Sequence, residues 1–229
     1  MIRFYFHPSP NPMKVALLLE EADLPYEMIP VDTRRGEQHT AAFKAINPNA
    51  KTPAIVDTEG DIRVFDSNAI LLYLAEKTGR FLPREPSQRG ELLSWLMLVA
   101  TGLGPYNGQA VHFQHHAPDR NAYAIKRYRF EAKRHFKLFD DQLAGKPYVL
   151  GEEYTIVDMA LWGWTNPLVY VLGEEAPGQF PELMRWKAAI DARPAAERAR
   201  ALGKSFTTPF DDAARKALFP QVDAPPEAA

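Results

Sequence analysis

The fold of the first eighty residues is decided by the stretch 51–78, KTPAIVDTEGDIRVFDSNAILLYLAEKT. Two short apolar runs, 53–57 and 62–65, flank a Glu59-Gly60 turn, which is typical of a β-hairpin. Ser67 follows directly and predicts the N-cap of a helix that runs to Lys77, with Gly79 just beyond its end. The stretch therefore predicts a hairpin that leads straight into a helix.

The residues before this stretch predict two strands and a helix between them. Ile2–Phe6 is an apolar and aromatic run ended by Pro8, and residues 12–23 carry apolar side chains at helical spacing. Tyr26–Val31 predicts a second strand, parallel to the first because a helix crosses between them. A weaker helical pattern covers Gln38–Ala45. The order β-α-β-α-β-β-α is that of a thioredoxin-like fold.

Strand patterns nearly vanish after Gly79. Long stretches with apolar residues at spacings of three and four follow, at Arg89–Gly102, Asp119–Leu143, Leu161–Leu172 and Phe180–Ala192. Helices of this kind bury their apolar stripes against one another. We therefore predict an α/β thioredoxin-like N-terminal domain joined to an all-α C-terminal helical-bundle domain. The expected boundaries are a first domain at 1–80, a linker at 81–87, a helical domain at 88–205 and a C-terminal tail at 206–229.

The composition excludes several kinds of site and partner. Lys and Arg number 27 against 29 Asp and Glu, which gives a net charge of -2, and the basic residues form no stripe for nucleic acid. There is no cysteine, so disulfides, thiolate metal sites and a CxxC redox pair are excluded. No run reaches the roughly 18 apolar residues of a membrane span, and the first residues lack a signal-peptide pattern. We expect a soluble cytoplasmic protein that binds neither nucleic acid nor membrane.

Pro53 is unusual because it opens a predicted strand, although proline cannot donate to a β-ladder. In a thioredoxin-like fold this position belongs to a cis-proline, whose preceding residue, Thr52, presents its backbone groups outward. Those groups can pair with an extended peptide as an added strand would. The motif taken alone fits a plain loop proline equally well, and the order of the elements favours the cis-proline.

Asp66 and Ser67 suit a ligand that carries both charges of an amino acid. The start of a helix offers unpaired N–H groups and the positive end of the dipole, which attract a carboxylate to Ser67. Asp66 beside it can accept from an ammonium group. The alternative is that Ser67 is an ordinary N-cap without a ligand.

The pairs Thr52-Pro53 and Asp66-Ser67, in this order of elements, resemble the glutathione-binding half of the glutathione transferase superfamily. Tyr154-Thr-Ile-Val-Asp158 resembles the capping box of the family's second domain, and the resemblance covers residues 1 to about 200. It implies that Thr52 and Pro53 bind the cysteinyl part of glutathione and that Asp66 and Ser67 bind its γ-glutamyl end. It also implies a homodimer with glutathione as co-substrate.

A finer resemblance lies in the segments 6–14, FHPSPNPMK, and 102–109, GLGPYNGQ, which are similar to the bacterial nu class. Members of that class lack the catalytic tyrosine and resemble glutathione-dependent disulfide reductases. Asn11 and Ser9 are then the catalytic candidates, since two hydrogen-bond donors near a helix N-terminus favour the thiolate of glutathione. The competing interpretation is that Asn11 is only the N-cap in front of Pro12.

Other positions are assigned by the same resemblance. Gln38 and Lys51 would contact the glycyl end of glutathione. Arg127 would reach a glutathione carboxylate, either within its own subunit or across a dimer. The alternative for Gln38 is a solvent-facing helix residue, and for Arg127 an ion pair with Glu131 on the same helix. A pocket for the electrophile would be walled by Tyr106, Phe113 and Trp164, each of which is equally suited to a hydrophobic core.

The motif His112-x-x-His115-His116 offers ring nitrogens for a metal, but it lacks a defined third ligand. We expect these histidines to form a polar rim of the electrophile pocket. The function predicted from the sequence is a glutathione transferase enzyme whose bound thiolate reduces disulfides, or attacks an electrophilic carbon. The alternative is a non-catalytic glutathione-binding or regulatory module of the same fold.

Overall fold

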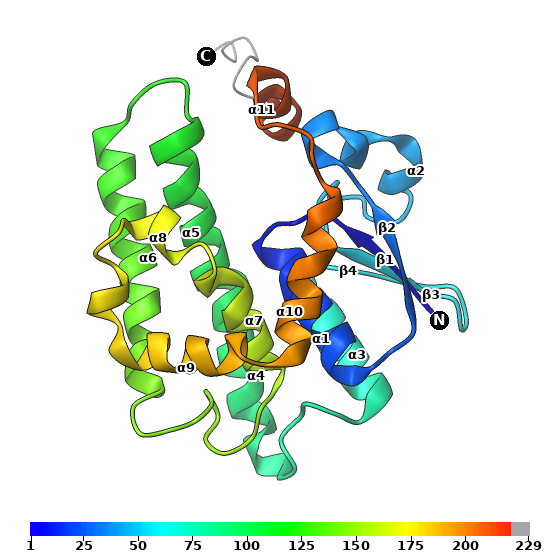
Figure 1. The fold of residues 1–229 in the computed structure, drawn as a ribbon, viewed down its shortest axis with the longest axis vertical. Helices are drawn as coiled ribbons and strands as arrows, with labels where there is room; N and C mark the ends of the chain where they lie inside the picture. Colours follow the sequence, from blue (N-terminus) through cyan, green and yellow to red (C-terminus); the bar gives the residue numbers. More distant parts are fainter. Residues whose placement is uncertain (221–229) are drawn as a thin grey trace.

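The computed structural model describes residues 1–220 and confirms a small sheet covered by helices, joined to a larger helical part (Figure 1). The sheet has the order β2-β1-β3-β4, with β1 parallel to β2 and antiparallel to β3, and β4 antiparallel to β3. The strands are β1 (Ile2–Phe6), β2 (Tyr26–Pro30), β3 (Ala54–Asp57) and β4 (Ile62–Phe65).

Alternation along β1 explains why both faces of the sheet are covered. Phe4 and Phe6 point into the main core with Leu18 of α1 (Pro10–Ala22) and Leu71 of α3 (Ser67–Thr78). Tyr5 points the other way and packs edge-on against Phe43 of the short helix α2 (Ala41–Lys44). The sheet is therefore a middle layer, as the thioredoxin-like prediction requires.

The second part of the described chain is helical, and its core continues that of the first. Trp162 and Leu183 belong to the same buried cluster as Phe4. The helices are α4 (Arg89–Leu98), α5 (Gly104–Val111), α6 (Ala122–Gln142), α7 (Ile156–Thr165), α8 (Leu168–Leu172), α9 (Pro181–Asp191), α10 (Pro194–Ala201) and α11 (Asp212–Leu218). Two π-helical turns, Val99–Leu103 and His112–His116, extend this series, and short 3-10 turns lie at Thr33–Arg35, Glu37–His39, Pro86–Gln88, Pro177–Gln179 and Leu202–Ser205. None of the helices within residues 1–220 has the length and apolar character needed to cross a lipid bilayer.

Glycine allows the two parts to approach closely. A Cβ built on Gly163 of α7 would lie 2.4 Å from the carbonyl oxygen of Pro10 and 2.6 Å from Cγ of Lys14. Real Cβ atoms do not make such contacts, so only glycine lets α7 pack this tightly on the first turns of α1. This contact fixes the N-terminus of α1 relative to the helical part.

The expected helix starts are wrong at two places. The first helix begins at Pro10 with Ser9 as its N-cap, so Asn11 lies inside the helix and does not cap it. The third helix has Asp66, not Ser67, as its N-cap, because the Asp66 carboxylate accepts from the N–H groups of Asn68 and Ala69. Gly79 ends that helix in the left-handed conformation, as predicted.

The capping box predicted for the second part is present. Thr155 caps α7, and the side chain of Asp158 accepts from the Thr155 N–H. The predicted apolar helix 161–172 is divided into α7 and α8, which Pro167 separates.

The region assigned as a tail contains regular structure. Its described residues include α11, which packs on the 3-10 turn Thr33–Arg35 of the first part, beside it in Figure 1. Residues 221–229 of the expected tail lie outside the described chain. The predicted helix Gln38–Ala45 is reduced to α2, because Thr40 caps a new helix there and Gln38 belongs to the preceding 3-10 turn.

Candidate functional site

The register of the sheet brings three predicted segments to one end of it. Ala54 pairs with Tyr5 of β1 on one side and with Phe65 of β4 on the other. The residues just outside these pairs are therefore Pro53, Asp66 and the loop that leads to α1. The Thr52–Pro53 peptide is cis, as predicted. The ladder of β3 starts at Ala54, so the backbone groups of Thr52 lie outside it.

Asp66 and Ser67 form the start of α3 at this end of the sheet. Asp66 has φ 68°, and its Oδ1 accepts from Asn68 N–H at 2.9 Å and Ala69 N–H at 3.2 Å. Ser67 is buried, and its Oγ accepts from the ammonium of Lys14 at 3.2 Å. The first turn thus combines a carboxylate, a hydroxyl and the positive end of a 12-residue helix, which suits an amino-acid ligand.

Asn11 is held by Trp164 across the junction of the two parts. The indole Nε1–H donates to Oδ1 of Asn11 at 3.0 Å. An indole nitrogen only donates, so this bond fixes the carbonyl oxygen toward Trp164 and leaves the amide Nδ2, with two N–H groups, on the other side. Ser9 is the N-cap of α1, and its hydroxyl makes no capping bond. Both predicted catalytic residues therefore keep side-chain donors at the N-terminus of α1.

Gln38 is covered by the C-terminal helix. It is 4% exposed, and its Nε2 donates to the carbonyl oxygen of Ala217 in α11 at 3.1 Å. Its Oε1 is buried without a partner among the described residues. Gln38 is therefore not the solvent-facing helix residue of the alternative interpretation, and the predicted contact with glutathione stays a prediction.

Lys51 lies next to Thr52, whereas Arg127 lies on α6. Lys51 is exposed beside Thr52, and its carbonyl oxygen accepts from Nδ2 of Asn47 at 2.5 Å. Arg127 on α6 forms the ion pair with Glu131 at 2.8 Å that was its alternative interpretation. A contact of Arg127 with glutathione across a dimer stays a prediction.

The three predicted walls of the electrophile pocket have different ring partners, and the pocket itself stays a prediction. Trp164 lies beside Asn11. Tyr106 stacks on His135 of α6 with the ring centroids 5.2 Å apart, and Phe113 stacks on Tyr128 of α6 with the centroids 5.3 Å apart. The structure thus places one of the three next to the catalytic candidates and two against α6.

The three histidines make aromatic contacts. His115 stacks on Tyr170 with the ring centroids 4.2 Å apart, and the rings of His112 and His116 pack on Phe219. Burial lowers the pKa of His112 and of His116, which favours neutral rings. Within residues 1–220 no group of three or more His, Asp or Glu side chains is arranged to hold a metal ion.

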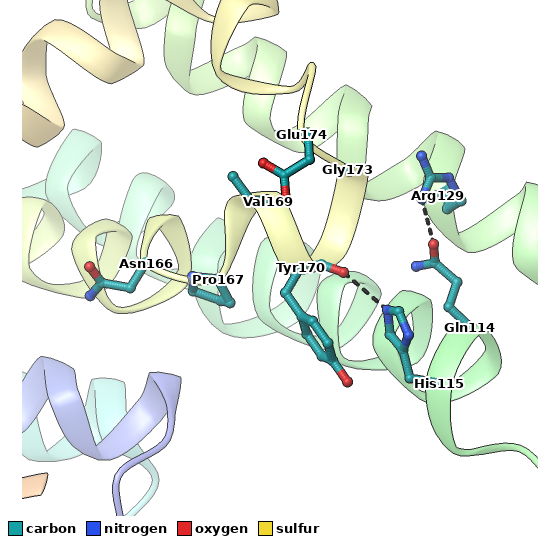
Figure 2. Close-up of a pocket in the computed structure, with 9 residues that line it drawn as sticks. All are labelled: Gln114, His115, Arg129, Asn166, Pro167, Val169, Tyr170, Gly173 and Glu174. Carbon is teal, nitrogen blue, oxygen red and sulfur yellow. Dashed lines mark hydrogen bonds between the residues drawn. The ribbon is translucent and has the colours of Figure 1, made fainter.

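A cavity of about 460 Å³ is lined by α6, α8 and the π-helical turn His112–His116, and none of the predicted glutathione-binding or catalytic residues lines it (Figure 2). Three of its polar side chains, those of Gln114, His115 and Arg129, have partners within the protein. Arg129 donates to Gln114 and to the carbonyl oxygens of Val171 and Leu172, and His115 contacts the carbonyl oxygen of Tyr170 at 3.1 Å. The side chains of Asn166 and Glu174 also line the cavity, and Figure 2 draws no hydrogen bond to either of them.

Lys14 lies in the segment 6–14, but its residue type and spacing do not predict a place at the site. Lys14 is 1% exposed, and it donates to Ser67 Oγ and to Asn68 Oδ1, both at 3.2 Å. The available signal was its position four residues before the buried Leu18, on the apolar face of the helix.

Comparison with known proteins identifies the family. Family models for the N-terminal and C-terminal domains of glutathione S-transferase match residues 8–77 and 102–194. The disulfide-bond oxidoreductase YfcG of Escherichia coli is 43% identical over 204 residues, which cover 87% of this chain and 94% of that protein.

Two solved structures are similar in fold and in sequence. A glutathione transferase family member from Pseudomonas fluorescens, with two glutathione bound, has a TM-score of 0.82 and 40% identity over 86% of this chain and 91% of that one. A glutathione transferase from Pseudomonas putida, with one glutathione disulfide bound per subunit, has a TM-score of 0.80 and 36% identity over 86% and 90% of the two chains. The chain belongs to the glutathione S-transferase family.

Proposed function

We propose that the protein binds glutathione across Thr52, Asp66 and Ser67 and uses the glutathione thiolate to reduce disulfide bonds. The observation that carries the proposal is the Asn11–Trp164 hydrogen bond, which leaves the Asn11 amide with two N–H donors at the start of α1. Glutathione bound along the same end of the sheet would present its sulfur to these donors. The disulfide-bond oxidoreductase named among the relatives supports this chemistry.

The donors suffice to activate a thiol. A free thiol with a pKa near ~8.5 is mostly protonated at neutral pH, and lowering that pKa by one unit takes roughly 1.4 kcal/mol. A hydrogen bond to a charged acceptor contributes about 1.5–3 kcal/mol. Asn11, Ser9 and the positive end of the α1 dipole together therefore stabilise the thiolate at neutral pH.

The reaction needs two glutathiones because the chain contains no cysteine. The first thiolate attacks one sulfur of the substrate disulfide, whose S–S bond breaks to give a mixed disulfide and a thiolate leaving group that takes up a proton. A second glutathione thiolate attacks the glutathione sulfur of the mixed disulfide and releases the other thiol. Two glutathiones are oxidised to glutathione disulfide, and one substrate disulfide is reduced to two thiols. The related structures with two glutathione, or with glutathione disulfide, support a site of this size.

We also propose that the protein acts in the cytosol and forms a homodimer. Glutathione keeps thiols reduced in the cytosol, so a glutathione-dependent reductase would act there. In the homodimer that the family implies, Arg127 would contact a glutathione carboxylate of the other subunit.

Side-by-side assays test the reaction. With glutathione as reductant, a small symmetrical disulfide is expected to turn over at least 10-fold faster than an aryl halide. Turnover of the aryl halide alone would assign conjugation instead. Retention on glutathione resin without turnover of either substrate would favour the non-catalytic binding module.

Asp66→Asn tests the proposed contact with the γ-glutamyl ammonium. Asparagine caps helices about as well as aspartate and tolerates positive φ, so α3 should keep its start and its stability. Loss of the charge is expected to weaken glutathione binding roughly 10-fold, since a hydrogen bond to a charged group contributes about 1.5–3 kcal/mol. Isothermal titration with glutathione measures the change. Wild-type affinity in the variant would show that Asp66 only caps the helix.

A further inference from the structure

Lys14 is a buried ammonium group that the proposed chemistry does not use. It lies on α1, is 1% exposed, and donates two hydrogen bonds, to Ser67 Oγ and Asn68 Oδ1. Asn68 is itself fixed, because its amide nitrogen donates to the carbonyl oxygen of Leu96 at 3.3 Å. Gly163 closes the other side, since its Cβ position lies 2.6 Å from Cγ of Lys14. Lys14 is therefore held in one place beneath the first turn of α3.

The surroundings do not neutralise this charge. Within residues 1–220 no carboxylate forms an ion pair with Lys14, and a buried charge without such a partner is costly. Burial lowers the pKa of Lys14 to about 7, and Asp66 opposes that shift. The other charged groups on the elements packed around it act elsewhere. On α1, Glu20 pairs with Arg198 of α10 and Glu21 with Arg193, which precedes α10. On α3, Glu76 pairs with Arg89 of α4, and Lys77 pairs with Asp57 and Glu59. On α7, Asp158 accepts from Val149, Thr155 and Trp186.

The two bonds of Lys14 determine what the first turn of α3 can offer. A serine hydroxyl has one proton to donate, and Ser67 Oγ already accepts from Lys14, so its O–H can point away from the ammonium. Asp66 takes the N–H groups of Asn68 and Ala69. The donors left for a carboxylate are the N–H and the O–H of Ser67, directly above a positive charge.

We propose that Lys14 is a positioning residue for the γ-glutamyl carboxylate of glutathione, acting through Ser67. Its ammonium orients the Ser67 hydroxyl toward the ligand and adds a buried positive charge to the anion-binding start of α3. The inference rests on the proposed glutathione site and adds to it the group that supports Ser67 from within the core. A buried cation without an ion pair is then explained by the anion that binds above it.

If Lys14 has this role, glutathione binding is coupled to the protonation of Lys14. Without ligand, Lys14 loses its proton near pH 7, and a bound carboxylate favours the charged form and raises the pKa of Lys14. The contribution of Lys14 to affinity is therefore complete below pH 7 and declines as the pH rises through the pKa of the free protein. S-methylglutathione is the suitable probe, since it has no thiol to titrate.

Lys14→Met removes the charge and keeps the length of the side chain. Its affinity for S-methylglutathione at pH 6.5 is expected to fall about 10-fold, with the loss in turnover appearing in KM for glutathione rather than in kcat. Wild-type affinity should decline between pH 6.5 and 8.5 more steeply than that of the variant, in which only the ammonium of the ligand titrates. Lys133→Met, which removes an exposed lysine of α6, is the matched control and should behave as wild type.

A double-mutant cycle tests the route through Ser67. Ser67→Ala and Lys14→Met should each weaken binding, and together they should weaken it by clearly less than the sum of the two single losses. Additive losses, wild-type affinity in Lys14→Met, or a flat pH profile of the wild-type protein would each overturn the inference, and the last needs no variant to fold. Binding of S-methylglutathione by the wild-type protein in those cases would leave the proposed function intact, whereas no binding at all would reject the proposed function itself.

Discussion

Replacing Asn11 with alanine is expected to lower the turnover of glutathione-dependent disulfide reduction about 10- to 100-fold, with little change in the affinity for glutathione. The Asn11 amide supplies donors to the sulfur only when that sulfur carries a negative charge. A hydrogen bond to a charged acceptor contributes about 1.5–3 kcal/mol, and each 1.4 kcal/mol is a factor of ten. Steady-state kinetics and titration with glutathione measure the two quantities separately.

Two further variants separate donation to the thiolate from packing at the junction. Asn11→Asp keeps the oxygen that accepts from Trp164 but replaces the donors with a negative charge, so it should be at least as slow as Asn11→Ala. Trp164→Phe removes the indole N–H while leaving the amide in place, and its loss should be smaller. Near-normal turnover of Asn11→Asp would reject Asn11 as the donor to the thiolate.

Gly163→Ala is expected to give the largest loss of stability. The added Cβ would lie 2.4 Å from the carbonyl oxygen of Pro10 and 2.6 Å from Cγ of Lys14, so α1 must move away from α7. Overpacking of this kind costs about 3 kcal/mol at the upper end, which corresponds to a drop in Tm of roughly 6 to 12 °C for a chain of this length. Thermal unfolding followed by circular dichroism measures it, and catalysis should fall as well because the same shift displaces Asn11.

Gly90→Ala is the matched control for that substitution. Gly90 lies in α4, and a Cβ built on it meets no atom within 4 Å. Alanine is a better helix former than glycine, so this variant should unfold at the wild-type temperature or slightly above it. Equal losses of Tm in the two variants would show that close packing at Gly163 does not matter.

The helices and strands were largely predictable because their signals are local. The hairpin around Glu59-Gly60, the helix end at Gly79 and the capping box of Thr155 and Asp158 each depend on residues within about four positions of one another. Helix starts were less reliable. Asp66 and Ser67 are both good capping residues, and Asp66 takes the role because its carboxylate accepts from the N–H groups of Asn68 and Ala69, whereas the Ser67 hydroxyl accepts from Lys14.

The side-chain partners at the candidate site were not predictable in the same way. Asn11 and Trp164 are separated by 153 positions, Lys14 and Ser67 by 53, and Gln38 and Ala217 by 179. Each pair meets only after helices from different parts of the chain have packed. The same packing turns Tyr106 and Phe113 toward α6 instead of toward Trp164.

The sequence by itself determined the order of elements, the Thr52-Pro53 and Asp66-Ser67 pairs and the absence of a protein thiol, because these follow from local patterns and composition. Only the tertiary structure decided which of these residues share one site and which partner each side chain takes. The physical reason is that a helical pattern shows that a face is buried but not what buries it. Lys14 illustrates the difference, since its position in the sequence marks an apolar face, and only the packing of α3 and α7 around it gives the ammonium its two acceptors.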